Sequence, residues 1–425
     1  MNISSVEGYS IYDSRGNPTV EVEVRLSNGA KGRGVAPSGA STGQFEAHEL
    51  RDGPNDSMRG KGVSRAVENV NREIHEVLQG LPANNQSAVD QRMIELDGTP
   101  NKSRLGANAI LATSTAVAAA AANAKGLPLY RHLGAGSTLP IPEIQMIGGG
   151  AHAHWRTDIQ DWLLIANGAK SYAETLEITF RVFHAVGDLL KEQGKISGVA
   201  DEGGYWPEFD SHEAVFEAVV EGIERAGYKP GLDASLALDI AASDLYDSEK
   251  QTYRLRLEDR VLDRSAWLDQ LNDWMSRYPV ISIEDPFADT DWEGWKSFME
   301  QWGKQVQVVG DDLFTTNPAR IRQGIDRGAA NAVLIKLNQI GTVSETLEAI
   351  ALTREAGWTP LVSARSGETE DAFITHLAVG TDSGQLKVGS FTRSERMVKW
   401  NEGLRIAREL GSRACFPEWR QTGPG

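Results

Sequence analysis

The sequence has 425 residues, of which 40% are hydrophobic and 24% are charged, and this length favours two domains over a single core. The formal net charge of −16 argues against nucleic acid or an anionic membrane surface as a partner, because both bind basic patches. The sequence has one cysteine, no apolar run long enough for a membrane helix and no signal-peptide pattern at its start. We therefore expect a cytoplasmic globular protein without disulfides.

The first part of the chain predicts a small sheet followed by helices. Residues 19–26 alternate between mostly apolar and charged side chains, which indicates a half-buried strand. Asn28 and Gly29 after it predict a hairpin turn, and the small residues of 35–43 predict a mobile loop. Residues 107–125 are rich in alanine and precede Gly126, so we expect a helix there.

Beyond a connection rich in glycine and proline, short apolar runs alternate with longer helical patterns. Each run predicts a buried parallel strand, and the first four runs end on a charged residue. This repetition predicts a (β/α) barrel, in which side chains at the carboxyl ends of the strands converge on one site. The runs are residues 236–239, 280–284, 306–311, 332–336 and 360–363.

Three carboxylates, Asp239, Glu284 and Asp311, end three successive candidate strands. Each one alone would suit a solvated strand end or a helix N-cap equally well. Three of them in the same structural position would form an oxygen-rich pocket, which favours Mg²⁺.

Lys336 ends the next candidate strand. A lysine at the mouth of a barrel beside metal charge can have its ammonium form disfavoured, which makes it a candidate base. The alternative is a surface salt bridge, which the apolar run before Lys336 argues against. Lys387 and the pair Arg365 and Ser366 are further candidates for an anionic substrate, because arginine with a hydroxyl suits a phosphoryl group.

Glu202 lies on a glycine-rich turn beside Asp201. A carboxyl near other carboxylates is a candidate for a raised pKa and therefore for a general acid. Taken by itself, this residue fits an ordinary loop carboxylate better than a general acid.

Nine segments of the chain resemble segments of the enolase family and follow one another in the family's order. Together they extend over nearly the whole chain. The resemblance implies an α/β fold, with an N-terminal α+β domain over residues 1–130 that caps a modified (β/α)8 barrel over residues 135–425 and opens in the order ββαα. It also implies a hydro-lyase that uses Mg²⁺, two ions per site during turnover, and that assembles as a homodimer or octamer. The segments are YDSRGNPTVEVEV, PSGASTG, NKSRLGANAI, DEGG, SIEDP, VGDDLFTTNP, LIKLNQIG, RSGETED and GQLKVG.

The resemblance also implies catalytic roles for single residues. Lys336 matches the base that removes the proton next to the substrate carboxylate. Glu202 matches the acid that helps the hydroxyl leave as water. His152 is retained from the family's second closing loop, where Gln160 precedes Asp161, the partner of that acid.

The binding residues follow in the same way. The three strand-end carboxylates match the ligands of the tighter metal, and Ser41 in the mobile loop matches a ligand of the second metal. Arg365 and Ser366 match the residues that hold the phosphate, and Lys387 matches the lysine that contacts the substrate carboxylate.

The chain departs from the family around this site. Ala364 replaces the histidine before Arg365, and Asp161 is one methylene shorter than the usual glutamate. His154 and Arg156 add positive charge to a loop that usually has small polar residues. Space and charge at the phosphorus end favour a larger, more anionic phosphorylated or phosphonylated hydroxy acid. The chain therefore resembles carboxyphosphonoenolpyruvate synthases of phosphinothricin-type biosynthesis.

Two alternatives remain open at this point. The chain could be an ordinary enolase that interconverts 2-phosphoglycerate and phosphoenolpyruvate, with Arg156 in a surface ion pair that contributes little. It could also be a non-catalytic binding protein, which the retention of the full set of catalytic residues argues against.

Overall fold

The N-terminal part of the chain forms an antiparallel sheet covered by helices. The structure is a computed structural model that describes residues 1–40, 42–196 and 198–419. Strands β1 (Ile3–Tyr12), β2 (Pro18–Leu26) and β3 (Lys31–Val35) pair in the order β1-β2-β3. The strand predicted over residues 19–26 is confirmed, and so is the turn after it, where Gly29 has φ +88°.

The alanine-rich helix packs against this sheet because both partners have small residues. A Cβ on Gly34 of β3 would lie 2.1 Å from Thr115 Oγ1 and 2.4 Å from the carbonyl oxygen of Ala112. Glycine in the strand and alanine in the helix therefore allow their backbones to approach closely. The helices of this part are α1 (Ser64–Asn69), a π-helical turn (Val70–Ile74), α2 (His75–Leu78), α3 (Gln86–Asp97), α4 (Ala107–Ala124) and α5 (Leu129–Leu133).

A closed barrel of eight strands follows. All five strands predicted from apolar runs are confirmed as β6 and β10 to β13. Strand β5 runs antiparallel to both β4 and β6, which gives the expected ββαα opening. The strands are β4 (Ile141–Gly148), β5 (Asp161–Ile165), β6 (Ser235–Asp239), β10 (Val280–Glu284), β11 (Gln307–Gly310), β12 (Ala332–Ile335), β13 (Thr359–Ser363) and β14 (Gln385–Ser390).

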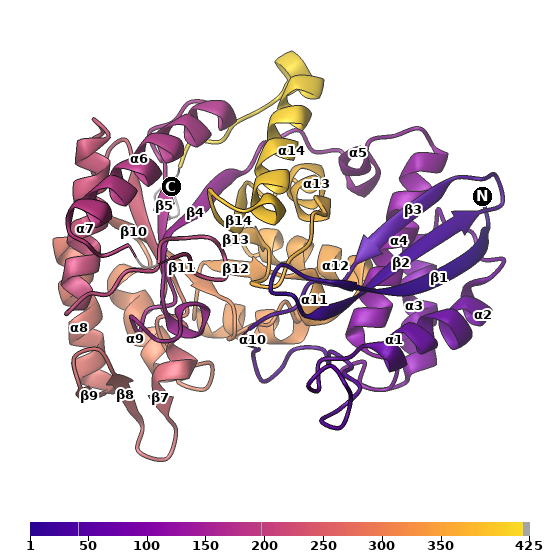
Figure 1. Cartoon of the computed structure of the whole chain (residues 1–425), viewed down its shortest axis with the longest axis horizontal. Helices are drawn as coiled ribbons and strands as arrows, with labels where there is room; N and C mark the ends of the chain where they lie inside the picture. The colour runs from indigo at the N-terminus through magenta and orange to yellow at the C-terminus, as the bar shows by residue number, and fades with distance from the viewer. Residues whose placement is uncertain (41, 197, 420–425) are drawn as a thin grey trace.

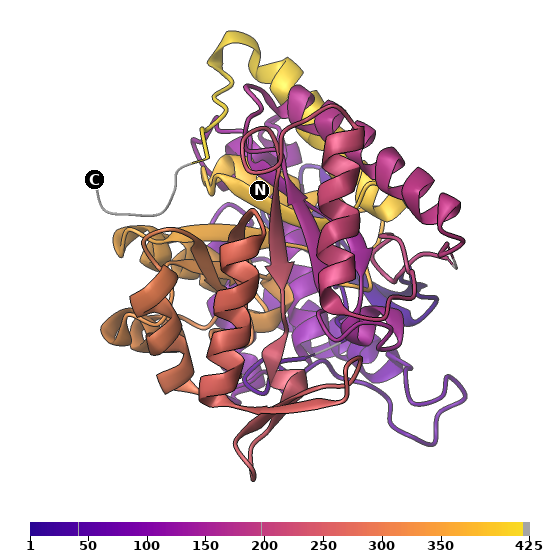
Figure 2. The same cartoon turned by 90° about the vertical axis from the view of Figure 1, so that its left-hand side faces the viewer.

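Helices surround the barrel, and a small sheet projects from it (Figures 1 and 2). This sheet lies between β6 and α8 and consists of β7 (Tyr246–Asp247), β8 (Thr252–Leu255) and β9 (Arg260–Asp263). None of the helices within the described residues is both long enough and apolar enough to cross a membrane. The helices are α6 (Tyr172–Glu192), α7 (His212–Arg225), α8 (Arg264–Arg277), α9 (Trp292–Trp302), α10 (Pro318–Arg327), α11 (Leu337–Ile340), α12 (Val343–Glu355), α13 (Phe373–Gly380) and α14 (Ser394–Leu410).

The segment after β3 joins the two parts of the molecule at the carboxyl ends of the barrel strands. Its backbone N–H at Ser38 donates to the carbonyl of Gly367, and the N–H of Ala47 donates to the carbonyl of Gln339. In Figure 1 the N-terminal sheet and helices α1 to α4 lie on the right and the barrel on the left. The N-terminal part therefore contributes to the end of the barrel where a site is expected.

Candidate active site

Two of the three strand-end carboxylates, Asp239 and Glu284, contact the same lysine. Asp239, Glu284 and Asp311 are all buried, at 2%, 2% and 6% exposure. Lys387 Nζ from β14 lies 2.8 Å from Asp239 Oδ2, 2.8 Å from Glu284 Oε2 and 3.2 Å from Asp161 Oδ2. Burial raises the pKa of Glu284 well above its usual range, and the charge of Asp239 raises it further. The strand ends therefore create a dense group of buried oxygens.

These oxygens fit a hard cation such as Mg²⁺. Glu284 Oε1 is buried and has no hydrogen-bond partner among the described residues. One group of carboxylates, Asp285, Asp311 and Asp312, places one oxygen from each residue within 4.8 Å of the others. Asp285 accepts the backbone N–H groups of Asp311 at 2.9 Å and Asp312 at 2.8 Å, so it orients the end of β11. An all-oxygen set with an unsatisfied buried acceptor is suited to magnesium.

Lys336 follows β12 and pairs with one of the same carboxylates. Its Nζ lies 2.5 Å from Asp311 Oδ2. Burial lowers the pKa of Lys336, but the charges of Asp311 and Glu284 raise it, and the net pKa lies above the usual value. The lysine is therefore held at a fixed place as an ammonium ion.

A second group of titratable residues lies across the pocket. Asp161 Oδ1 lies 3.5 Å from His152 Nδ1 and accepts a 2.5 Å hydrogen bond from Gln145 Nε2, and His152 Nδ1 is 4.0 Å from Glu202 Oε1. Burial and the charge of Asp161 raise the pKa of Glu202. Burial also acts to raise the pKa of Asp161, but Lys387 and His152 bring it below its usual range. The environment therefore moves the pKa values of the two carboxyls apart, upward for Glu202 and downward for Asp161, as an acid and its ionised partner require.

Arg365 provides the positive charge at the opposite end. Its guanidinium is 4% exposed and forms two hydrogen bonds with Glu46, at 2.9 and 3.2 Å. Burial lowers the pKa of Arg365, but the charge and hydrogen bonds of Glu46, with the charge of Asp311, raise it, and the net change is upward. Ser366 Oγ accepts the backbone N–H of Ala40 at 2.8 Å, so the segment after β3 reaches this end of the site.

Most of the predicted residues line one pocket. Gln160 Nε2 donates to Asp239 Oδ2 at 3.0 Å, which links the β4–β5 loop to the carboxylates. Ser41, the expected ligand of a second metal, lies outside the described residues, but its neighbours Gly39 and Ala40 line the pocket. The lining residues are Gly39, Ala40, His152, Gln160, Asp161, Glu202, Asp239, Lys336, Ser363, Ala364, Arg365, Ser366 and Lys387.

Comparison with known proteins gives the family. Residues 136–422 match the family model of the enolase C-terminal TIM barrel domain, and residues 3–133 match that of the enolase N-terminal domain. The chain is also 52% identical to Enolase 1 of Desulfitobacterium hafniense (strain Y51) over 420 residues, which are 98% of this chain and 96% of that protein. The chain belongs to the enolase family. It is a hydro-lyase of a family that depends on Mg²⁺, and the acidic groups described above could hold that ion.

The expectation of a carboxyphosphonoenolpyruvate synthase is wrong. The high identity over nearly the full length of an enolase indicates an ordinary enolase instead. The shorter Asp161 keeps its contacts to Gln145, His152 and Lys387, so its replacement of glutamate leaves it within the charge network. Ala364 lines the pocket at 5% exposure.

His154 and Arg156 do not line the pocket, contrary to expectation. Arg156 pairs with the exposed Glu208 at 2.8 Å, and its guanidinium lies 4.7 Å from the centre of the Trp206 ring. His154 stacks on the same ring at 5.3 Å. Aromatic contact and ion pairing therefore direct both side chains toward the segment 206–208, as in the surface ion-pair alternative.

Three residues of this enolase site were missed from the sequence. Glu46 holds Arg365, and Gln145 holds Asp161. Arg396 is fully buried and donates to the backbone carbonyls of Arg365 and Ser366, each at 2.6 Å. Gln145 is a polar residue within a buried strand, and it interrupts the apolar run by which that strand could have been predicted. No local pattern in the sequence indicates that Glu46 and Arg396 pair with residues about 30 to 320 positions away.

Proposed function

We propose that the protein catalyses the reversible dehydration of 2-phosphoglycerate to phosphoenolpyruvate, as enolase does. The observation that carries this proposal is that Lys336, Glu202 and Arg365 line the same pocket. A fixed amine and a buried carboxylic acid on one pocket suit removal of a proton and protonation of a leaving hydroxyl. Near full-length identity to an enolase supports the same reaction.

The role of each residue follows from its surroundings. In its neutral form, which a cation bound by Asp311 would favour, Lys336 removes the proton next to the substrate carboxylate, and Glu202, whose pKa is raised by burial, donates a proton to the departing hydroxyl. Arg365 and Ser366 hold the phosphate, while Lys387 orients the carboxylate end. Asp239, Glu284 and Asp311 would hold Mg²⁺, with Ser41 at a second ion, and the metal would stabilise the negative charge that develops on the carboxylate.

His152, Gln160 and Asp161 complete the acid side of the site. Gln145 and His152 keep Asp161 beside Glu202, and the negative charge of Asp161 helps to keep the proton on Glu202. Gln160 is held by Asp239 and so joins the acid side to the metal side.

We further propose the expected division of the chain and its assembly. Residues 1–130 would form the capping part and residues 135–425 the barrel part of the enzyme. Enolase family members act on small phosphorylated acids and usually form homo-oligomers, so a dimer or octamer is the assembly that we expect here.

The test is turnover of 2-phosphoglycerate with Mg²⁺, followed by the ultraviolet absorbance of the enol product. Lys336→Ala and Glu202→Gln should each lower kcat about 10²–10⁴-fold, the usual contribution of a general acid or base. A matched control is Lys304→Ala, which changes a lysine that lies outside the pocket. A wild-type enzyme without turnover, or full activity in Lys336→Ala, would overturn the proposal.

A further inference from the structure

The loop that joins β4 to β5, residues 149–160, brings His152 and Gln160 to the pocket. Its two limbs are hydrogen-bonded together, from Gly150 N to the carbonyl of Thr157 and from Gly149 N to the carbonyl of Gln160, both at 2.8 Å. A Cβ on Gly149 would lie 2.0 Å from Thr157 Oγ1, so this close approach requires glycine. The position of Gln160, and of Asp161 after it, therefore depends on what holds the 149–160 loop in place.

The tip of this loop has an unfavourable backbone. His154 and Trp155 are consecutive non-glycine residues in the left-handed region, with φ of 51° and 61°. Such residues persist only where surrounding contacts compensate for the strain. His154 stacks on Trp206, and the Trp155 ring centre lies 3.8 Å from the guanidinium carbon of Arg256. Contacts from outside the loop therefore hold its tip.

The base of the loop is docked on the turn between β8 and β9. Asp158 is 2% exposed, and its carboxylate accepts the backbone N–H groups of Arg256 at 2.9 Å and Leu257 at 3.0 Å. Arg256 thus contacts both the tip and the base of the loop. The β7–β9 sheet, which projects from the barrel in Figures 1 and 2, has this turn against the active-site loop.

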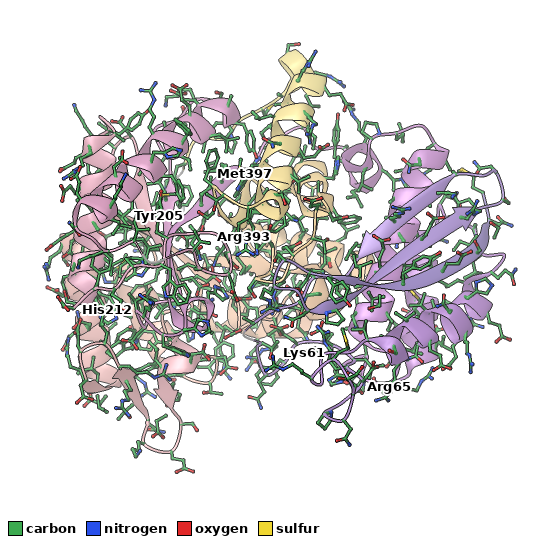
Figure 3. All side chains as sticks on the ribbon, viewed as in Figure 1. Lys61, Arg65, Tyr205, His212, Arg393 and Met397 are labelled. Carbon is green, nitrogen blue, oxygen red and sulfur yellow. The ribbon has the colours of Figure 1, made fainter. Side chains whose placement is uncertain are left out.

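One buried histidine joins the loop to the turn. His212 begins α7 and is fully buried, and Figure 3 shows it on the side of the barrel from which the β7–β9 sheet projects. Its Nε2 lies 3.2 Å from Asp158 Oδ2, and its Nδ1 lies 2.7 Å from Glu258 Oε1. The Nδ1 contact is a hydrogen bond and the Nε2 contact is at ion-pair distance, so the charged imidazole, with an N–H group on each nitrogen, suits both carboxylates.

The charges around His212 favour this form. Burial lowers the pKa of His212, but Asp158 and Glu258 raise it, and the net change is upward. Arg260 pairs with Glu258 at 3.1 Å, and the Trp274 ring of α8 lies 5.5 Å from the imidazole. Beyond the two carboxylates, the nearby charged side chains are those of Arg256, Arg260 and Glu213, which is the neighbour of His212 in the chain.

We propose that His212 is a positioning residue of the active site: as an imidazolium it ties Asp158 of the 149–160 loop to Glu258 of the β8–β9 turn. This bridge keeps the loop closed in the strained conformation that places Gln160 and Asp161 at the pocket. His212 itself lines no part of the pocket, so its effect is transmitted through two residues of backbone from Asp158 to Gln160. Only the predicted fall in kcat rests on the proposed function; the predicted positioning of the loop does not.

The test compares His212→Asn with His376→Asn in the full-length enzyme. His376 is the matched control, because it is a partly buried histidine on α13 that pairs with Glu402 at 3.4 Å, away from the loop. Hydrogen–deuterium exchange of peptides over 149–160 should become at least about tenfold faster in His212→Asn and stay unchanged in His376→Asn. The kcat for 2-phosphoglycerate should fall at least about tenfold in His212→Asn, with less than about a threefold change in KM, because the phosphate end is held elsewhere.

Glu258→Gln separates positioning from general loss of structure. The amide still accepts from His212 Nδ1 but removes one of the two charges that keep the imidazole protonated. The decline of kcat at alkaline pH should therefore move to lower pH by at least about half a unit, with near wild-type kcat at slightly acid pH.

Two results would overturn the proposal. One is unchanged exchange over 149–160 in His212→Asn. If that variant does not fold, the other is an unchanged pH profile together with unchanged loop exchange in Glu258→Gln. A wild-type enzyme that does not convert 2-phosphoglycerate would overturn the proposed function instead, and the exchange measurement would still test the bridge.

Discussion

Arg396→Lys should weaken the hydrogen bonds that hold the backbone of Arg365 and Ser366 in place. The buried Arg396 guanidinium donates to the carbonyls of Arg365 at 2.6 Å, Val388 at 2.8 Å and Ser366 at 2.6 Å. A lysine keeps the charge but lacks the planar guanidinium group, which donates hydrogen bonds to carbonyls on two chain segments. If it keeps one bond, two buried carbonyls lose a donor at about 1–3 kcal/mol each, so unfolding should need about 2–6 kcal/mol less.

This effect would be a large share of the usual stability of a folded protein, about 5–15 kcal/mol. Urea unfolding followed by tryptophan fluorescence measures it, and steady-state kinetics should show KM for 2-phosphoglycerate rising at least about tenfold. The control is Arg405→Lys, because Arg405 is 62% exposed and pairs with Glu402 on the surface, where changes stay within about 0.5 kcal/mol. A free energy of unfolding within about 1 kcal/mol of wild type in Arg396→Lys would refute the reasoning.

Three further predictions concern the metal, the acid side and the loop bridge. Chelation of divalent ions should abolish turnover and Mg²⁺ should restore it, whereas activity that persists in chelator would show that the carboxylate group holds no essential ion. Gln145→Leu removes the donor to Asp161 Oδ1 and the acceptor of the Gly204 N–H, so kcat should fall about tenfold or more while Mg²⁺ affinity changes little; an unchanged kcat would show that Asp161 is positioned without Gln145. The hydrogen bond from His212 lowers the pKa of Glu258 to about 2, so this carboxylate stabilises the fold above its unfolded pKa of about 4.5 and loses that contribution as pH falls toward 2. The stability difference between wild type and Glu258→Gln, measured by urea unfolding, should therefore shrink from pH 5 downward, and a constant difference would contradict this assignment.

The barrel was predictable where the strands are uniformly apolar and end in charge. Val280–Glu284 is the clearest case, because its predicted and observed bounds agree. Strand β4 is also buried along its whole length but includes Glu143 and Gln145, which break the apolar run. Their partners, Gln307 for Glu143 and Asp161 for Gln145, come from other strands, so the local pattern does not reveal that these polar groups are satisfied.

The candidate site, like the barrel, could be predicted only in part. Lys336, Asp239 and Glu284 follow recognisable strands, and their convergence follows from the barrel itself. Arg156 was misplaced because its charge suggested a ligand, while the structure gives it Trp206 and Glu208 as partners. The choice between a pocket and a surface ion pair depends on loop geometry, which a sequence pattern does not encode.

The contact between Ala40 and Ser366 joins positions 326 residues apart in the chain. Arg396, which holds the same segment, is synthesised later still, so a ribosome-bound chain cannot assemble this end of the site until almost all of it has emerged. Contacts of such long sequence separation form late and slow the search for the native state. A chain truncated before Ser366 therefore lacks both this contact and the hydrogen bonds from Arg396.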